Sequence, residues 1–230
     1  MPFYMPFIPL LIWLGAVSAA LSATNVLLPG LADWKKVFID NLIFSSGATI
    51  GIVVTVFLVR SSFADGIKGF GISVRTIPGD FGIALVNLTS IWPIIILTMM
   101  LTILIGQSAL GTRFKMPQHE ELELITTHHQ LSVRLMIVIT AIVAVPIFEE
   151  MLFRGLFQTL IRSFLIKPWR SIAASSIIFA MAHPTPAHWP ALFVLSLCLG
   201  YSYEKSGSLF RPIFIHSLFN GLSILAALYQ

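Results

Sequence analysis

The stretch AVPIFEEMLFRGLFQTLI, residues 144–161, places two carboxylates and a guanidinium inside an otherwise apolar run. Similar apolar runs recur along the chain: 57% of its 230 residues are hydrophobic and 10% are charged, with a mean hydropathy of +0.90. Soluble domains are about a quarter charged, so this composition argues against one and predicts an integral membrane protein. A membrane-spanning helix needs about 20 apolar residues, so the chain has room for seven or eight.

The apolar runs predict an all-α fold, a polytopic integral membrane bundle of about seven to eight helices. The predicted helices cover residues 8–28, 41–59, 81–106, 134–160, 171–187, 189–203 and 211–228. The run 189–203 is short enough to be a partial or tilted span. The polar segment 116–132 is suited to an additional interfacial helix. We predict a single integral membrane domain over residues 1–230.

The basic residues are scattered between the predicted spans. If all seven runs cross, eight Lys and Arg lie on the side of the N-terminus and five on the other, which predicts a cytoplasmic N-terminus. The net charge of +4 therefore indicates contact with a lipid bilayer and no nucleic-acid partner. The protein has one cysteine, Cys198, which excludes a disulfide framework and a cysteine-rich metal site.

Ionisable side chains inside a span are costly unless they are paired or hydrated, so they mark functional sites. Helical positions four apart share a face, so Glu150 can pair with Arg154. Glu149 is rotated from Glu150 by about 100° and faces elsewhere. A carboxylate without a charge partner in apolar surroundings suits general-base catalysis. The spacing therefore predicts a supporting role for Glu150 and a catalytic role for Glu149.

Two later predicted helices add polar groups with the same spacing. Phe179 and His183 share one face, and His216 and Asn220 share another. At about 1.5 Å per residue, Glu149, His183 and Asn220 lie about 13–18 Å from the helix ends on the N-terminal side. Such groups can hold and activate a water and donate hydrogen bonds to an oxyanion. The pattern predicts a hydrolytic site that needs no nucleophilic side chain.

These residues resemble the motifs of the CAAX protease and bacteriocin-processing family (CPBP, or Abi), which includes the Rce1-type CAAX prenyl endopeptidases. The family motifs EExxxR, FxxxH and HxxxN or HxxxD are matched in order by Glu149, Glu150 and Arg154, by Phe179 and His183, and by His216 and Asn220. The resemblance covers residues 145–225, which we take as the catalytic core. It implies an all-helical fold of about eight helices and a glutamate-dependent intramembrane endopeptidase.

The resemblance also implies a role for each catalytic residue. Glu149 and His183 would activate the hydrolytic water, while His216 and Asn220 would form the oxyanion site. The substrate would be a membrane-associated peptide or a lipidated protein. In Rce1-like enzymes it is the C-terminal tripeptide after a prenylated cysteine, but the sequence does not identify the substrate of this chain.

The remaining motif residues, Glu150, Arg154 and Phe179, are implied to be supporting; Glu150 and Arg154 would support the helix and its catalytic neighbour. Family members have been described both as metalloproteases and as metal-free enzymes. One Glu and two His can in principle bind zinc. We favour no metal and no cofactor, because an oxyanion role requires His216 and Asn220 to be unligated.

The catalytic motifs of other membrane proteases fit this sequence less well. The HExxH motif of zinc proteases is not matched, because the sequence that begins at His119 has Glu123 where the second His belongs. All four Asp residues fall outside the predicted spans or at their edges, which excludes an aspartyl intramembrane protease. The serines at 206 and 208 lie in a loop, unlike those of rhomboid-type proteases.

Two functions from other classes stay open. One is a non-catalytic membrane protein of the same fold that binds a peptide or confers bacteriocin self-immunity. The other is a transporter that uses intramembrane acids as proton carriers, although the two halves show no repeat. In every case the predicted location is a membrane crossed several times, the inner membrane if the source is bacterial.

Overall fold

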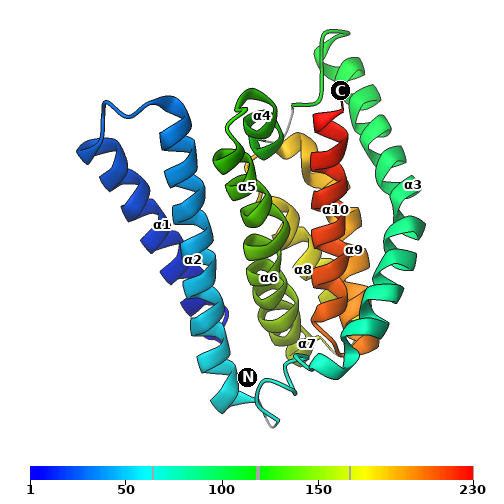
Figure 1. Cartoon of the computed structure of the whole chain (residues 1–230). Coiled ribbons are helices and arrows are strands. Elements are labelled where there is room, and N and C mark those ends of the chain that lie inside the picture. The colour runs from blue at the N-terminus through cyan, green and yellow to red at the C-terminus, as the bar shows by residue number, and fades with distance from the viewer. Residues whose placement is uncertain (64, 118–119, 166, 230) are drawn as a thin grey trace. The chain divides into compact units, whose positions relative to one another are not determined.

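The computed structural model describes residues 1–63, 65–117, 120–165 and 167–229. Within these ranges the secondary structure is helical and contains no strand (Figure 1). The predicted all-α class is therefore confirmed. His119, where the rejected metalloprotease motif begins, lies outside the described residues.

Among the described residues, five helical segments are long and apolar enough to cross a membrane. They are α1 (Phe7–Leu27), α2 (Asp33–Ser62), Val74–Leu110, which contains α3 (Ile77–Leu110), Leu131–Phe164, and α10 (Phe210–Leu228). Many of their large apolar side chains face outward; Phe57, Val86 and Ile105 are examples. Outward-facing apolar surface on long helices is what a hydrocarbon environment stabilises, so the chain is a multi-pass integral membrane protein.

The segment Leu131–Phe164 is not a regular α-helix throughout. It consists of α5 (Leu131–Ile139), α6 (Val145–Glu150) and α7 (Thr159–Phe164), separated by the π-helical stretches Thr140–Ala144 and Met151–Gln158. A π-helix bonds residue i to residue i+5 and so accommodates an extra residue in a turn. The predicted span 134–160 thus forms one long helix with two changes of pitch.

Two predicted spans form helices with other bounds than expected, one shorter and one longer. The run 171–187 becomes α8 (Pro168–Met181), whose 14 residues rise about 21 Å, less than the hydrocarbon thickness of about 30 Å. The run 189–203 becomes α9 (Trp189–Ser206), with 18 residues. Helix α8 ends early because Pro184 disfavours helical geometry in the residue before it. The segment 116–132 contains the short helix α4 (Glu120–Thr127).

The described chain packs as two units. The first comprises Met1–Phe70, His119–Leu152 and His216–Gln230, and the second Gly71–Gln118 and Phe153–Ile215. The boundary falls within the segment Leu131–Phe164 and within α10. We describe each unit by itself, and the single domain over residues 1–230 stays a prediction.

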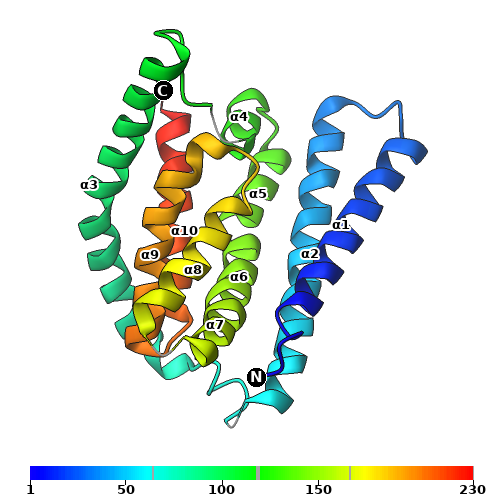
Figure 2. The same cartoon turned by 180° about the vertical axis from the view of Figure 1, so that it is seen from behind.

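In the first unit, α1 and α2 lie side by side (Figures 1 and 2). Gly47 and Gly51, four residues apart on α2, allow this close packing, because a Cβ at Gly47 would meet Val17 and Trp13. A Cβ at Gly51 would meet the ring of Phe148 on α6. Small residues spaced this way let membrane helices approach closely.

Polar contacts add to this packing. The hydroxyl of Ser45 on α2 lies 2.8 Å from that of Thr140, at the start of the first π-helical stretch. A buried apolar cluster also joins α2, α4, α5 and α10; it contains Val37, Ile125, Val133, Ile137 and Ile224. The first unit therefore holds α6, which carries the two glutamates, against α2.

In the second unit, α9 packs against both α8 and α3. The chain just before the 3-10 turn that leads into α3 is tied to the start of α10, where the amide of Leu209 donates to the carbonyl of Gly71 at 2.9 Å. Gly71 has φ of +98°, and a Cβ there would lie 2.6 Å from the carbonyl oxygen of Gly207, so only glycine fits.

A buried ion pair fastens the same region. Nε and Nη2 of Arg211 each lie 3.0 Å from Oδ1 of Asp80, in the first turn of α3. The side chain of Asp80 is 3% exposed. The sequence placed Asp80 at the edge of a span and gave it no partner, because the contact joins residues 131 positions apart.

Candidate functional site

The EExxxR motif begins in an α-helix and ends in a π-helix. Glu149 and Glu150 are the last residues of α6, and Arg154 lies within the π-helical stretch Met151–Gln158. The prediction from sequence assumed a regular helix through the motif, so the i, i+4 geometry applies only approximately here. π-Helical turns are rare and occur often at functional sites.

In the first unit, the imidazole of His216 lies between the two glutamates. Its Nδ1 is 2.8 Å from Oε1 of Glu150, and its Nε2 is 3.8 Å from Oε2 of Glu149. The side chain of Glu150 is fully buried, whereas that of Glu149 is 19% exposed. The two neighbouring carboxylates thus differ in access, and Glu149 is the one that solvent or a substrate can reach.

The contact with Glu150 fixes which nitrogen of His216 is protonated. An ionised carboxylate only accepts hydrogen bonds, so Nδ1 carries the hydrogen donated to Glu150. A neutral His216 then has its lone pair on Nε2, and an Nε2–H exists only in the imidazolium form. The 3.8 Å between Nε2 and Glu149 is too long for a direct hydrogen bond but suits one bridging water.

Asn220 lies one turn beyond His216 on α10 and makes a contact that the sequence did not predict. Its Nδ2 donates to the carbonyl of Ala141 at 2.8 Å. Ala141 is in the π-helical stretch Thr140–Ala144, where the i+5 partner of its carbonyl would be Pro146, which has no N–H. The amide of Asn220 supplies that donor and retains a second N–H.

In the second unit, Arg154 is buried among partners from two helices. Its Nη2 donates to Oγ of Ser196 on α9 at 2.7 Å. Its guanidinium carbon lies 4.6 Å from the ring centroid of Phe179 on α8. Phe179 of the FxxxH motif therefore stacks on the arginine of the EExxxR motif, a cation–π contact. Ser196 was not predicted as a site residue, because a small hydroxyl side chain in an apolar run does not stand out.

His183 lies just past the end of α8, not inside a helix as predicted. Its Nδ1 is 2.9 Å from the carbonyl oxygen of Phe179, so Nδ1–H is the donor and a neutral His183 has its lone pair on Nε2. The indole of Trp189 donates to the carbonyl of His183 at 2.9 Å. Hydrogen bonds therefore hold both the ring and the backbone of His183, and Nε2 is the ring nitrogen that can accept a proton.

A second histidine, His188, is buried in the 3-10 turn Pro186–His188 between α8 and α9. Burial lowers the pKa of His188 below its usual 6.5; a hydrogen bond with the backbone of Pro117 raises it, and the charge of His183 lowers it. The folded protein therefore favours neutral His188.

This shift predicts a pH-dependent stability. Because the folded pKa of His188 lies below the unfolded value, its contribution is fully present above about pH 6.5 and is lost as the pH falls through the folded pKa. We expect the melting temperature of the parent to fall more steeply between pH 7 and pH 5 than that of His188→Gln. Parallel slopes in thermal unfolding scans would contradict this assignment.

The seven predicted site residues divide between the two units. The first unit holds Glu149, Glu150, His216 and Asn220; the second holds Arg154, Phe179 and His183. In the first unit His216 lies beside both glutamates, and in the second Phe179 contacts both Arg154 and His183. The predicted pairing of Glu150 with Arg154, and that of Glu149 with His183, join residues of different units and stay predictions.

All seven residues fall inside one family match. Residues 131–222 match the family described as type II CAAX prenyl endopeptidase Rce1-like. This segment is Rce1-like. No curated protein and no solved structure matches the chain significantly. The resemblance stated from the three motifs is confirmed, and this segment is similar to a family of peptidases.

The donor geometry of the Rce1-like segment bears on zinc. Zinc sites bring three or more nitrogen, oxygen or sulfur ligands to about 2.0–2.3 Å from one ion. Among the described residues, no group of three or more His, Cys, Asp or Glu side chains is arranged to hold a metal ion. In the first unit, Nδ1 of His216 is hydrogen-bonded to Glu150, an arrangement that leaves Nε2 as the nitrogen that could bind an ion. The described side chains provide no complete zinc site within either unit.

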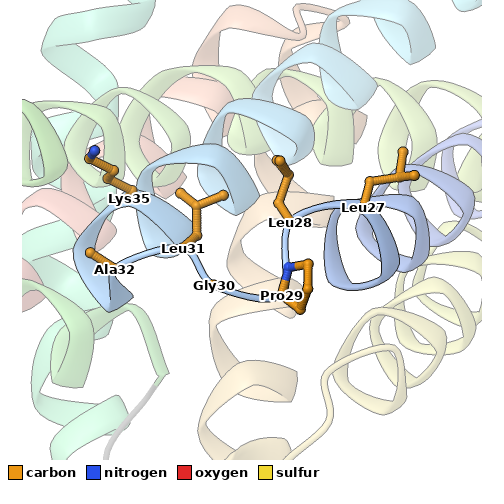
Figure 3. Close-up of a pocket in the computed structure, with 7 residues that line it drawn as sticks. All are labelled: Leu27, Leu28, Pro29, Gly30, Leu31, Ala32 and Lys35. Carbon is orange, nitrogen blue, oxygen red and sulfur yellow. The ribbon is translucent and has the colours of Figure 1, made fainter.

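A cavity of about 430 Å³ lies at the loop between α1 and α2, and its lining residues are outside the matched residues 131–222 (Figure 3). It is lined by residues 27–32 and Lys35. These residues include no carboxylate, imidazole or thiol, so they provide neither a general base nor a nucleophile. The candidate catalytic groups therefore all belong to the Rce1-like segment.

Proposed function

We propose that the protein is a glutamate-dependent intramembrane endopeptidase that hydrolyses a peptide bond of a membrane-associated substrate. The observation that carries this proposal is the pair of unlike glutamates: Glu150 is buried against His216, while Glu149 is accessible 3.8 Å from the same imidazole. A supporting carboxylate and an available one, in a membrane-spanning helix of a peptidase family, are what a water-activating site requires.

In the proposed reaction a water attacks the carbonyl carbon of the scissile bond. Glu149 accepts the proton of that water, and Nε2 of His183 holds the water as a hydrogen-bond acceptor. The imidazolium of His216 and the second N–H of Asn220 stabilise the tetrahedral oxyanion. Glu149 then returns the proton to the leaving nitrogen as the C–N bond breaks. Each step uses side chains of this chain and needs no metal or cofactor.

The substrate class follows from the family and the location. A lipidated or membrane-associated peptide would partition into the bilayer beside the Rce1-like segment, and a C-terminal tripeptide after a prenylated cysteine is the first candidate. In a bacterial source the enzyme would lie in the inner membrane.

The test is cleavage by the purified full chain in lipid nanodiscs. Prenylated and unprenylated peptides of the same sequence are incubated with and without a chelator, and new termini are identified by mass spectrometry. We expect cleavage that the chelator does not inhibit. Loss of cleavage on chelation would contradict the metal-free mechanism and indicate a metal-dependent one. Binding without cleavage by folded protein would favour the non-catalytic peptide-binding or self-immunity alternative.

A further inference from the structure

A second cavity, of about 240 Å³, lies in the second unit where α8 begins and α9 ends. It is lined by Pro168, Trp169, Ile172, Tyr201, Glu204 and Lys205. The rings of Trp169 and Tyr201 stack with centroids 5.4 Å apart and planes 16° apart, which makes a flat aromatic wall. None of these residues belongs to the three motifs, so the proposed peptidase chemistry does not use them.

A contact with a membrane-spanning helix places the cavity at the membrane surface. Nε of Arg162 donates to Oε1 of Glu204 at 3.1 Å. Arg162 lies in the last turn of the segment Leu131–Phe164, which is long enough to cross the bilayer. The cavity is therefore level with the end of a span, where hydrocarbon gives way to headgroups. Tryptophan and tyrosine are enriched at that depth.

The charges around the cavity are mainly positive. Nζ of Lys205 lies 5.8 Å from the ring centroid of Tyr201. Lys167 and Arg170, both exposed, flank Pro168 and Trp169 in the chain. The carboxylate of Glu204 is already paired with Arg162. One cation thus lies over the aromatic wall and two more adjoin it in the chain, while its own carboxylate is already paired.

We propose that this cavity binds the headgroup of an anionic phospholipid. The phosphate would contact Lys205, with Lys167 and Arg170 contributing long-range attraction. The glycerol backbone and first methylenes would pack on Trp169, Tyr201 and Ile172. A free phosphate would leave that apolar wall unused, whereas a membrane lipid uses both the wall and the cations. This inference rests on the integral membrane fold and not on the proposed peptidase activity.

The test uses tryptophan fluorescence of the full chain in detergent, titrated with brominated phosphatidylglycerol or brominated phosphatidylcholine. Subtracting the signal of Trp169→Phe isolates the contribution of Trp169. We expect phosphatidylglycerol to quench that contribution at a mole fraction at least about fivefold lower than phosphatidylcholine, since one basic residue near the surface is worth about that factor. Equal quenching by the two lipids would overturn the proposal.

Charge variants test the same site with effects of opposite sign. Lys205→Gln should weaken the phosphatidylglycerol effect about fivefold. Glu204→Gln should strengthen it, because the cavity loses its carboxylate and Arg162 is released. Lys35→Gln is the matched control: Nζ of Lys35 also lies over an aromatic ring, 5.5 Å from the centroid of Trp34, but outside this cavity. An unchanged Lys205 variant, or a weakened Glu204 variant, would contradict the proposal.

A competition experiment separates a lipid from a soluble anion. Inorganic phosphate is added to the lipid-loaded protein and compared with sodium chloride at the same ionic strength. We expect equal, partial relief of quenching, because both salts only screen the charges. Greater relief by inorganic phosphate would show a site for soluble anions and would overturn the lipid assignment.

Discussion

Replacing Glu149 by Gln should lower the rate of peptide cleavage by at least about a hundredfold, because general-base catalysis contributes about 10²–10⁴-fold and an amide cannot take up the proton of the water. The side chain is partly accessible and Gln has nearly the same shape, so the melting temperature should change little. The measurement is the single-turnover rate of the purified variant, with product termini identified by mass spectrometry.

Glu123→Gln is the matched control for this substitution. Glu123 is an exposed glutamate on α4, outside the three motifs, so its variant should cleave at the parental rate. Parental activity in Glu149→Gln would assign the base to another group. Loss of activity in both variants would indicate that the loss does not depend on which glutamate is replaced, so it would not identify Glu149 as the base.

Replacing Arg211 by Gln should reduce the free energy of unfolding by about 3–5 kcal/mol, the usual cost of stranding one charge of a buried pair. The reason is Asp80, whose side chain is 3% exposed and whose Oδ1 accepts both contacts from the guanidinium. The measurement is reversible denaturation in detergent, or the melting temperature where unfolding is irreversible.

A double-mutant cycle separates the ion pair from simple loss of packing. Asp80→Asn combined with Arg211→Gln leaves no buried charge, so the double variant should be more stable than Arg211→Gln alone. Arg75→Gln should change the free energy of unfolding little, because Arg75 is an exposed cation just before α3, the helix that carries Asp80. If Arg211→Gln costs no more than Arg75→Gln, the pair does not stabilise the second unit.

Apolar runs located the long helices but not their ends. Helix α2 begins at Asp33, whereas the sequence predicted its start at residue 41. The intervening residues include Trp34, Lys35, Lys36 and Asp40, which are too polar for hydrocarbon. Hydropathy marks the part of a helix that lies in the membrane core, while backbone hydrogen bonding continues into the headgroup region. The predicted span 41–59 is therefore shorter than α2.

Six of the seven site residues could be selected from the sequence because polar groups are rare in apolar helices and each one stands out. The seventh, Phe179, was selected by its spacing to His183 in the FxxxH motif. The residues that contact them could not be predicted from the sequence. Arg154 contacts Ser196, Asn220 contacts the carbonyl of Ala141, and the carbonyl of His183 contacts Trp189. These contacts join residues that are apart in the sequence or involve main-chain atoms, and neither kind leaves a pattern in one sequence. The two π-helical stretches were also missed; Pro146 was the only signal near them.

The stretch Thr140–Ala144 has a consequence for how this protein tolerates change. A π-helical turn holds one residue more than an α-helical turn, so removing a single residue there would let the helix become regular. Because that extra residue is absorbed within one turn, the helix beyond the deletion would keep nearly the same orientation, and Glu149 and Glu150 would still face His216. A deletion in the regular helix α5 would instead rotate everything beyond it by about 100° about the helix axis and turn both glutamates away from His216. Loss of one residue should therefore be tolerated better within these five residues than within α5.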